Sequence, residues 1–347
     1  MIRVVTLCSG YDSQCLALNE LKKRHCDFDY DLVAWSEIDK VAIKAHNALF
    51  PQWADRNKGD MTTIDWNSVP DFDMLFYSTP CQDFSKAGYG AGGEEGSGTR
   101  SSLLWYTRNA IVAKKPTYLI MENVDAIIST KHVAVFNRWL DELESYGYSN
   151  FYKVLNAKDY GVPQGRKRCF VVSILYPDRP FCFTHDPVAG NPLDVIMHGF
   201  VDGYQVDGLN NYLFSIGVDK DDLFDAMCMN NGCKNVDGWL VAPRLMKNGT
   251  YNTLACWSGT NMRGLVFGVD SPIPTMYLCK NGNITLRKIS ADERYRLMGV
   301  RDDDIKKLMS CGFTIPNHCF LSGNSIVVDV LIDILDKLLY GGISSLW

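Results

Sequence analysis

The stretch VTLCSGYDS, residues 5–13, places a short apolar run directly before a turn with a single glycine. Other apolar runs of strand length follow along the first half of the chain, each bounded by turn residues. Together the runs span residues 4–8, 32–35, 74–78, 118–121 and 170–175. Amphipathic segments lie between them, and in residues 133–143 the apolar side chains recur at helical spacing before Gly147. Strands that alternate with helices predict an α/β fold, with a mostly parallel sheet covered on both faces.

The pattern changes near residue 176, where the chain becomes rich in loops and loses clean periodicity. Regular structure returns at the sequence SADE, residues 290–293, a capping box that opens a short helix. The final apolar stripe, residues 327–338, needs a core, and the sheet of the first half is its simplest partner. We therefore predict a first domain over 1–185, a small inserted domain over 186–285, and a return to the first domain over 286–347.

Composition narrows the class of protein. A length of 347 residues with 46% hydrophobic residues is ample for a buried core. The net charge of −5 provides no global basic field, so any contact with nucleic acid must rest on local positive charge. The 12 cysteines are scattered and form no CxxC pair, which predicts reduced thiols and no metal site. The first residues form a strand and not a leader, and no run of about 18 apolar residues indicates a membrane span. We expect a cytoplasmic protein.

The strongest local signal is STPCQDFS, residues 78–85, directly after an apolar strand. The carboxyl end of such a strand is where α/β sheets place reactive groups, so Cys81 is a candidate nucleophile. A half-buried structural cysteine is the alternative. The glycine-rich stretch 88–98 that follows cannot pack as a core element and favours the first interpretation, because it suits a lid beside the cysteine.

Two further signals also lie at the ends of predicted strands. Glu122 follows an apolar run, where a carboxylate must be used or paired, and burial would favour its neutral, acidic form. Arg166 and Arg168 occupy alternate positions of an extended segment, so they are expected to point to the same side. They could hold an anion, a base edge or a carboxylate.

The opening turn suits a cofactor. The single glycine, Gly10, lets a ligand approach the backbone, and Glu37 after the second strand suits a ribose hydroxyl pair. A further acid, Asp60, suits an adenine amino group. As a dinucleotide fingerprint the turn is poor, because it holds only one glycine.

In this order, the segments resemble the cytosine-C5 DNA methyltransferase family, over residues 3–176 and 287–338. The resemblance is carried by Pro80-Cys81-Gln82 with Phe84-Ser85 and Ala87-Gly88, by Arg100 and Leu103-Leu104, by Glu122-Asn123-Val124, by Gln164, Arg166 and Arg168, by Arg287, Ser290, Glu293, Arg296, Leu297 and Gly299, and by Gly323-Asn324-Ser325. The first motif departs from the family's Phe-x-Gly-x-Gly, because Cys8 and Asp12 replace the Phe and the second Gly. The resemblance implies a Rossmann-like methyltransferase sheet with a smaller, loop-rich target-recognition domain.

The resemblance also implies a mechanism. Cys81 would attack C6 of a flipped-out cytosine, so that C5 becomes nucleophilic and accepts the methyl group of S-adenosyl-L-methionine. Glu122 would donate a proton to ring N3, Arg168 would hold the base oxygen O2, and Arg166 would order the site. Loss of the C5 proton and expulsion of Cys81 would release the product.

The remaining implied roles concern the cofactor and DNA. Cofactor contacts would come from Leu7, Ser9, Gly10, Glu37, Ile38, Asp60, Met61, Ser78, Pro80, Asn324 and Ser325. Contacts to double-stranded DNA would come from Gln82, Ser85, Arg100, Arg244, Thr253 and Arg263. By the same resemblance we expect a monomer that leaves S-adenosyl-L-homocysteine and serves bacterial or phage DNA modification, for example in a restriction–modification system.

Three alternatives stay open on the sequence. The first keeps the chemistry on another substrate, a cytosine in transfer RNA; the low net charge keeps it open, whereas the long insert rich in Gly and Pro favours an enzyme that reads DNA sequence. The second is an idle regulatory homologue, disfavoured by the joint presence of Cys81, Glu122, Arg166 and Arg168. The third is a nicotinamide oxidoreductase, disfavoured by the poor glycine turn.

Overall fold

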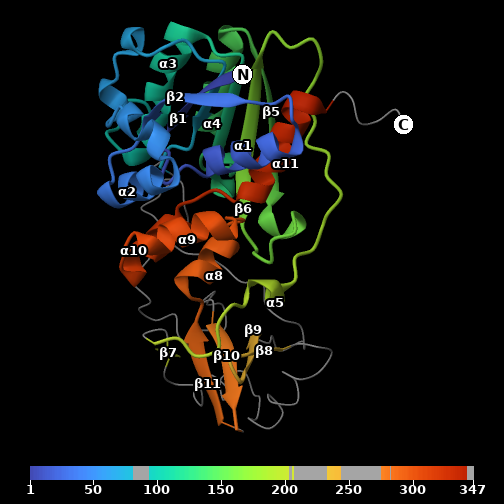
Figure 1. Cartoon of the computed structure of the whole chain (residues 1–347). Coiled ribbons are helices and arrows are strands. Elements are labelled where there is room, and N and C mark those ends of the chain that lie inside the picture. Colours follow the sequence, from blue (N-terminus) through green and yellow to red (C-terminus); the bar gives the residue numbers. More distant parts are fainter. Residues whose placement is uncertain (81–93, 203–204, 207–232, 244–274, 282, 342–347) are drawn as a thin grey trace. The chain divides into compact units, whose positions relative to one another are not determined.

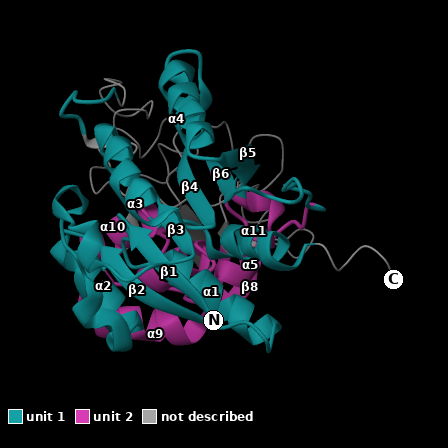
Figure 2. Ribbon diagram, turned by 90° about the horizontal axis from the view of Figure 1, so that it is seen from above, with its two compact units in different colours: residues 1–156, 167–186, 325–347 teal, residues 157–166, 187–324 magenta. Residues whose placement is uncertain are grey.

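The structure is a computed structural model that describes the chain except residues 81–93, 203–204, 207–232, 244–274, 282 and 342–347. It divides into two compact units (Figure 2). Unit 1 comprises residues 1–156, 167–186 and 325–347, and unit 2 comprises residues 157–166 and 187–324. Unit 2 therefore includes residues 286–324, whereas the sequence-based boundary assigned them to the first domain.

A sheet that has six strands among the described residues forms the centre of unit 1 (Figure 1). In spatial order the strands are β2 (Tyr30–Ser36), β1 (Ile2–Leu7), β3 (Met74–Tyr77), β4 (Tyr118–Val124), β6 (Lys167–Leu175) and β5 (Tyr148–Asn156). The pairs β1/β2, β1/β3 and β3/β4 are parallel, whereas β6 runs antiparallel to β4 and to β5. The predicted mostly parallel sheet is confirmed, and every predicted strand is present within a few residues of its expected limits.

Helices cover both faces of this sheet (Figure 2). The helices α3 (Thr107–Lys114) and α4 (Val133–Ser145) pack on the face that Val5 and Leu7 of β1 enter. Side chains alternate along a strand, so Val4 and Thr6 point to the opposite face, where α1 (Ser13–Arg24) and α11 (Val328–Tyr340) pack on each other. The helix α2 (Lys40–Leu49) follows β2.

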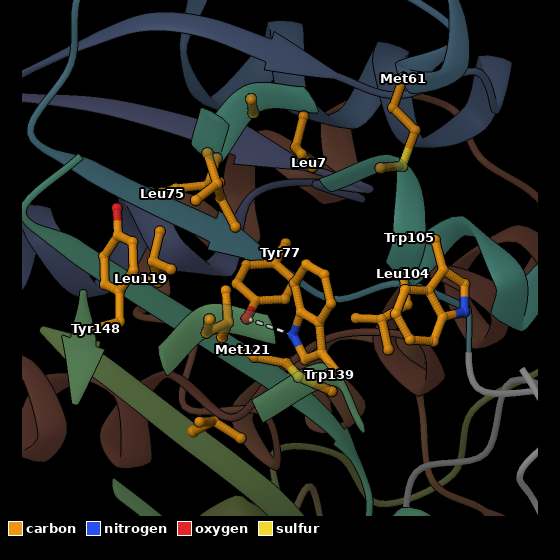
Figure 3. Packing of buried hydrophobic residues seen from close by; sticks show 14 of the residues in the cluster. Leu7, Met61, Leu75, Tyr77, Leu104, Trp105, Leu119, Met121, Trp139 and Tyr148 are labelled. Atoms are coloured by element: carbon orange, nitrogen blue, oxygen red, sulfur yellow. Dashed lines mark hydrogen bonds between the residues drawn. The ribbon is translucent and has the colours of Figure 1, made fainter. Parts of the chain in front are cut away.

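Aromatic side chains fill the core beneath α3 and α4 (Figure 3). The indole Nε1 of Trp139 donates a hydrogen bond to the Tyr77 hydroxyl at 3.2 Å, and burial raises the pKa of Tyr77. Trp105 meets Trp139 edge to face, with ring centroids 5.7 Å apart. Such aromatic pairs contribute about 0.5–1.5 kcal/mol beyond the area they bury. This core fixes β3 and β4, whose carboxyl ends carry the candidate catalytic residues.

The apolar stripe predicted near the C-terminus is buried on α11, which belongs to unit 1. Within the described chain, Ile315–Tyr340 has the length and composition of a membrane-spanning helix. However, 78% of its most apolar window is buried inside the protein, and residues 324–327 separate it into α10 (Ile315–Gly323) and α11. These are the properties of core helices.

The described part of unit 2 contains an antiparallel sheet in the order β7 (Gln205–Val206), β11 (Asn283–Lys288), β10 (Thr275–Lys280), β9 (Trp239–Pro243) and β8 (Lys234–Val236). Its helices include α5 (Pro192–Val195), α8 (Ala291–Arg296), α9 (Asp302–Ser310) and α10. The predicted capping box of Ser290 and Glu293 opens α8. Arg287 and Glu293 form a fully buried ion pair that links β11 to α8.

Candidate active site

In the turn after β1, three alternate residues have a left-handed backbone conformation. Cys8, Gly10 and Asp12 have φ values of 51°, 59° and 67°. Gly10 suits this conformation, and a Cβ at its position would meet nothing within 4 Å, so the space in front of it is open. Leu7 and Ser9 are buried, and the Ser9 hydroxyl has no hydrogen-bond partner among the described residues. The turn thus offers an open backbone and an unused hydroxyl.

Glu37, after β2, holds this turn and is only partly buried. Its Oε2 accepts from the Gly10 N–H at 2.9 Å, and its Oε1 accepts from Ile38 N at 2.8 Å and Asp39 N at 2.9 Å. A carboxylate has about four acceptor sites, so one remains for a further donor. The Ile38 side chain is 69% exposed beside it, which is unusual for a large apolar residue. Both predicted residues therefore lie at the Gly10 turn.

Asn57 joins Glu37 to the next loop, and the sequence reasoning missed it. Its Oδ1 accepts from Glu37 N at 3.2 Å and Gly59 N at 3.0 Å, and its Nδ2 donates to Glu37 O at 3.0 Å. Ser36 Oγ adds a bond to Gly59 O at 2.6 Å. The available signal was the Asn two residues before a glycine, which is typical of a side-chain-capped turn.

Asp60 and Met61 follow in that loop. Asp60 is exposed and accepts from Thr62 N at 2.9 Å, and Met61 is buried with its Sδ 3.5 Å from the Cys8 thiol. Burial, and then the negative charges of Glu37 and Asp60, raise the pKa of Cys8 to about 12. The two predicted carboxylates, Glu37 and Asp60, thus both raise the pKa of the same thiol in the turn, that of Cys8.

Ser325 supports the turn from its other side. It is buried, and its Oγ donates to the Tyr11 hydroxyl at 2.5 Å and lies 3.3 Å from Ser13 Oγ. Asn324, the neighbouring predicted residue, belongs to unit 2, where it is exposed and caps α10. Of the pair, Ser325 has observed contacts with the predicted cofactor turn.

The segment that leads to Cys81 is fixed from two directions. Ser78 N lies 3.5 Å from Leu7 O, which continues the pairing of β3 with β1. The Thr79 carbonyl accepts from Asn123 Nδ2 at 3.3 Å, and the Pro80 carbonyl accepts from Ser101 Oγ at 2.8 Å. Both donors are buried.

Several predicted residues lie outside the described ones. They are Cys81, Gln82, Ser85, Arg244, Thr253 and Arg263. Arg100 is the first residue of the 3₁₀ helix Arg100–Tyr106, and its side chain is not described. The roles assigned to these residues stay predictions.

Glu122 and Arg168 meet across two strands. The register sets Glu122 opposite Phe170 and Val124 opposite Arg168, so the two side chains are diagonal neighbours. Arg168 Nε lies 3.1 Å from Glu122 Oε1, and both side chains are largely buried. The two side chains therefore form an ion pair across β4 and β6. Burial, and then the charges of Glu122 and Asp125, raise the pKa of Cys169 to about 12.

Arg166 has a different environment. It precedes β6 by one residue and belongs to unit 2, where its guanidinium donates to the Gly323 carbonyl at 3.0 Å. Gln164, also buried in unit 2, donates to Leu297 O at 2.6 Å. Arg166 and Arg168 therefore have separate protein partners. The described residues contain no group of three or more His, Cys, Asp or Glu placed to hold a metal ion.

The chain is similar in sequence to known proteins. A family model described as C-5 cytosine-specific DNA methylase matches residues 2–190. The Type II methyltransferase M2.ScrFI of Lactococcus lactis subsp. cremoris is 35% identical over 286 residues, which cover 82% of this chain and 71% of that protein. The Orphan methyltransferase M.SssI of Spiroplasma monobiae is 32% identical over 305 residues, 84% of this chain and 72% of its own.

Solved structures agree on the fold. The S. pombe Dnmt2 methyltransferase superposes with a TM-score of 0.66 at 18% identity, covering 99% of this chain and 100% of that one. A putative DNA modification methyltransferase encoded within a prophage of E. coli gives 0.57 at 20% identity, with 97% and 98% covered. The Rossmann-like methyltransferase fold and the enzyme class predicted from sequence, DNA (cytosine-5-)-methyltransferase, are confirmed. The chain belongs to the C-5 cytosine-specific DNA methylase family.

Proposed function

We propose that this chain transfers a methyl group from S-adenosyl-L-methionine to carbon 5 of a flipped-out cytosine in double-stranded DNA. The observation that carries the proposal is the Glu122–Arg168 pair at 3.1 Å. Met121 of β4 is paired with Tyr77, the last residue of β3, so Glu122, the next residue of β4, lies beside the segment that leads from β3 to Cys81. A nucleophile, a carboxylate and a guanidinium are the groups that activation of a cytosine ring requires.

The turn after β1 fits the cofactor. The open space at Gly10 gives the cofactor room, and the Ser9 hydroxyl can form a hydrogen bond with it. The partly buried Glu37 carboxylate can bind the ribose. Exposed Ile38 provides an apolar surface for an adenine ring. S-adenosyl-L-methionine would supply a methyl group on a positively charged sulfur, in a turn that Glu37 and Asp60 make electronegative.

Each residue then has a defined task. The Cys81 thiolate adds to C6 of the base, forming a covalent adduct in which C5 becomes nucleophilic. Arg168 holds Glu122 and can reach a base oxygen, while Glu122 shares a proton with ring N3. After methylation, the C5 proton leaves and the Cys81–C6 bond breaks. Arg166, bonded to Gly323 O, is assigned a positioning role in unit 2.

The substrate assignment follows the relatives. Both M2.ScrFI and M.SssI are named as methyltransferases of the type II or orphan class, and M.Rho11sI of Bacillus phage rho11s is 35% identical over half of this chain. We therefore propose bacterial or phage DNA modification in the cytoplasm by a monomer. The loop-rich residues 186–285 are proposed to recognise the target sequence, with Arg244, Thr253 and Arg263 as DNA contacts.

The test is transfer of a labelled methyl group, with wild type and Cys81→Ser run in parallel. Labelled S-adenosyl-L-methionine is incubated with sequence-diverse duplex DNA or with transfer RNA, and the product is digested to nucleosides. We expect labelled 5-methyldeoxycytidine from wild type and none from the variant. Label in transfer RNA alone would overturn the DNA assignment, and transfer to neither substrate would indicate an idle homologue.

A further inference from the structure

Asp12 stands at a backbone position that suits glycine. It replaces the second glycine of the family's Phe-x-Gly-x-Gly motif, and its φ of 67° and ψ of 60° lie in the left-handed region. Asp and Asn tolerate this region better than other non-glycine residues, yet glycine has no steric penalty there. Because Asp12 is fully buried, its carboxylate also has to be stabilised by neighbours.

Three groups surround that carboxylate. Thr6 Oγ1 donates to Oδ2 at 2.8 Å, and Cys15 N donates to Oδ1 at 3.2 Å, which caps the start of α1. The third group is the imidazole of His46, whose Nε2 lies 3.6 Å from Asp12 Oδ2. We call Asp12, Thr6 and His46 the Asp12 clasp.

His46 is held so that it faces Asp12. Its side chain is fully buried on α2, and its ring stacks on Trp35 of β2 with centroids 3.7 Å apart. No described residue forms a hydrogen bond with its Nε2, so the Asp12 carboxylate is the polar group next to that nitrogen. The clasp therefore ties the turn to β1, α1 and α2.

The clasp acts on the groups proposed to hold the cofactor. The Asp12 N–H donates to Ser9 O at 2.8 Å and closes the turn, which contains Gly10. The N–H of Gly10 in turn donates to Glu37. We propose that Asp12 and His46 are positioning residues for S-adenosyl-L-methionine, which keep Ser9, Gly10 and Glu37 in binding geometry. This inference rests on the proposed function.

Three substitutions distinguish a role of the Asp12 clasp from an aspartate that is merely compatible with a positive φ. Asp12→Gly keeps the backbone conformation and removes every side-chain contact. Asp12→Asn also tolerates the conformation and keeps an acceptor for Cys15 N, but it places an NH2 group where Oδ2 accepts from Thr6, and it removes the charge that faces His46. His46→Phe keeps a ring that can stack on Trp35 and removes the nitrogen.

A matched control exists for the hydroxyl. Thr6 and Thr107 are both fully buried in unit 1. Thr6 donates to Asp12, whereas the Thr107 hydroxyl has no hydrogen-bond partner among the described residues. Thr6→Val should therefore weaken cofactor binding, and Thr107→Val should not.

The experiment measures the dissociation constant of S-adenosyl-L-homocysteine by calorimetry, together with KM and kcat for methyl transfer. We expect about tenfold weaker binding in Asp12→Gly, as loss of one or two net hydrogen bonds predicts, with partial recovery in Asp12→Asn. At saturating cofactor, kcat should stay within about twofold of wild type, since the clasp adds no group to the reaction. The double variant Asp12→Asn with His46→Phe should lose less than the sum of the two single losses.

The outcomes are distinct. Equal dissociation constants for wild type and Asp12→Gly would overturn the clasp while leaving the proposed function intact. Failure of the wild type to bind S-adenosyl-L-homocysteine would overturn the proposed function and the clasp with it. If Asp12→Gly does not fold, Thr6→Val against Thr107→Val decides, and equal binding by these two contradicts the clasp.

Discussion

Arg168 Nε lies 3.1 Å from Glu122 Oε1, across the antiparallel pair of strands β6 and β4. This contact gives Glu122 a charged partner in the absence of substrate. In the proposed mechanism, a base that enters the site would meet an arginine and a carboxylate already oriented by each other. The pair would then hold the ring and direct a proton to it.

Glu122→Gln keeps the shape of the side chain and removes its charge and its exchangeable carboxyl proton. We expect kcat to fall by about 10²- to 10⁴-fold, the range for loss of an acid–base group, with binding of S-adenosyl-L-homocysteine unchanged. Steady-state kinetics and calorimetry measure the two quantities. The matched control is Glu142→Gln, which breaks the ion pair with Arg108 elsewhere in unit 1. Full activity in Glu122→Gln would contradict the assigned role.

Ser101 positions the chain just before Cys81. Its buried hydroxyl donates to the Pro80 carbonyl at 2.8 Å. Ser101→Ala should lower kcat by about two- to tenfold, the effect of losing one net hydrogen bond from the nucleophile's support. Ser102→Ala is the control, because that buried hydroxyl donates to the local Thr99 carbonyl at 2.6 Å. Equal kcat values for the two variants would show that the Pro80 contact does not position Cys81.

The buried ion pair in unit 2 predicts an asymmetric effect on stability. Arg287 binds both carboxylate oxygens of Glu293 at 2.7 Å and donates to the carbonyls of His198 and Gly199. Glu293→Gln should lower the free energy of unfolding by about 3–5 kcal/mol, because a buried charge is left without its partner. The double variant Arg287→Met with Glu293→Leu should recover part of it. Urea denaturation tests both, and a loss below about 0.5 kcal/mol in Glu293→Gln would contradict the account.

The His198–Asp292 contact, 2.6 Å long, makes the stability of unit 2 depend on pH. The hydrogen bond that His198 donates to the Asp292 carboxylate raises the pKa of His198. Although burial opposes the shift, hydrogen bonds from His198 and Ser290 lower the pKa of Asp292 to about 2. The lowered pKa of Asp292 stabilises the folded protein above about pH 4, and this stabilisation is lost as the pH falls toward 2. The raised pKa of His198 stabilises the folded protein below about pH 6.5, and this stabilisation is lost as the pH rises through the raised pKa.

His198→Gln should therefore destabilise the protein more at pH 5.5 than at pH 8.5. The histidine is partly exposed, so we expect a difference of about 0.5–1 kcal/mol between the two conditions. Urea denaturation of wild type and variant at both pH values measures it. An equal loss of stability at the two pH values would contradict the assigned pKa shift.

Much of the fold could be predicted from local pattern. The alternation of apolar runs with amphipathic segments indicated the sheet, the sequence SADE indicated the start of α8, and the apolar stripe indicated a buried α11. Each of these signals is local, because it depends on residues within one or two turns of helix or one strand. The antiparallel pairing of β5 and β6 is not local, and the sequence pattern did not indicate it.

The sequence identified residues of the site one by one, but it predicted the contacts between them less well. Glu122 and Arg168 were both identified, but their pairing depends on a strand register between segments 46 residues apart in number (168 minus 122). Asp12 was recognised as a departure from the family motif, yet its contact with His46 requires two helices to pack on the same turn. Asn57 was missed because its role lies in hydrogen bonds to the backbone of Glu37, 20 residues earlier in the chain, and that contact depends on the tertiary structure.

In the proposed mechanism, Cys81 attacks cytosine C6 while a methyl group is added at C5. Its most direct test is incubation with S-adenosyl-L-methionine and sequence-diverse duplex DNA in which 5-fluorocytosine replaces cytosine. Fluorine at C5 cannot leave as a proton does, so the adduct should persist. We expect mass spectrometry to detect a peptide in which Cys81 is linked to a methylated fluorocytosine nucleotide. We expect no adduct in Cys81→Ser. An adduct on another residue, or undiminished adduct in Cys81→Ser, would contradict it.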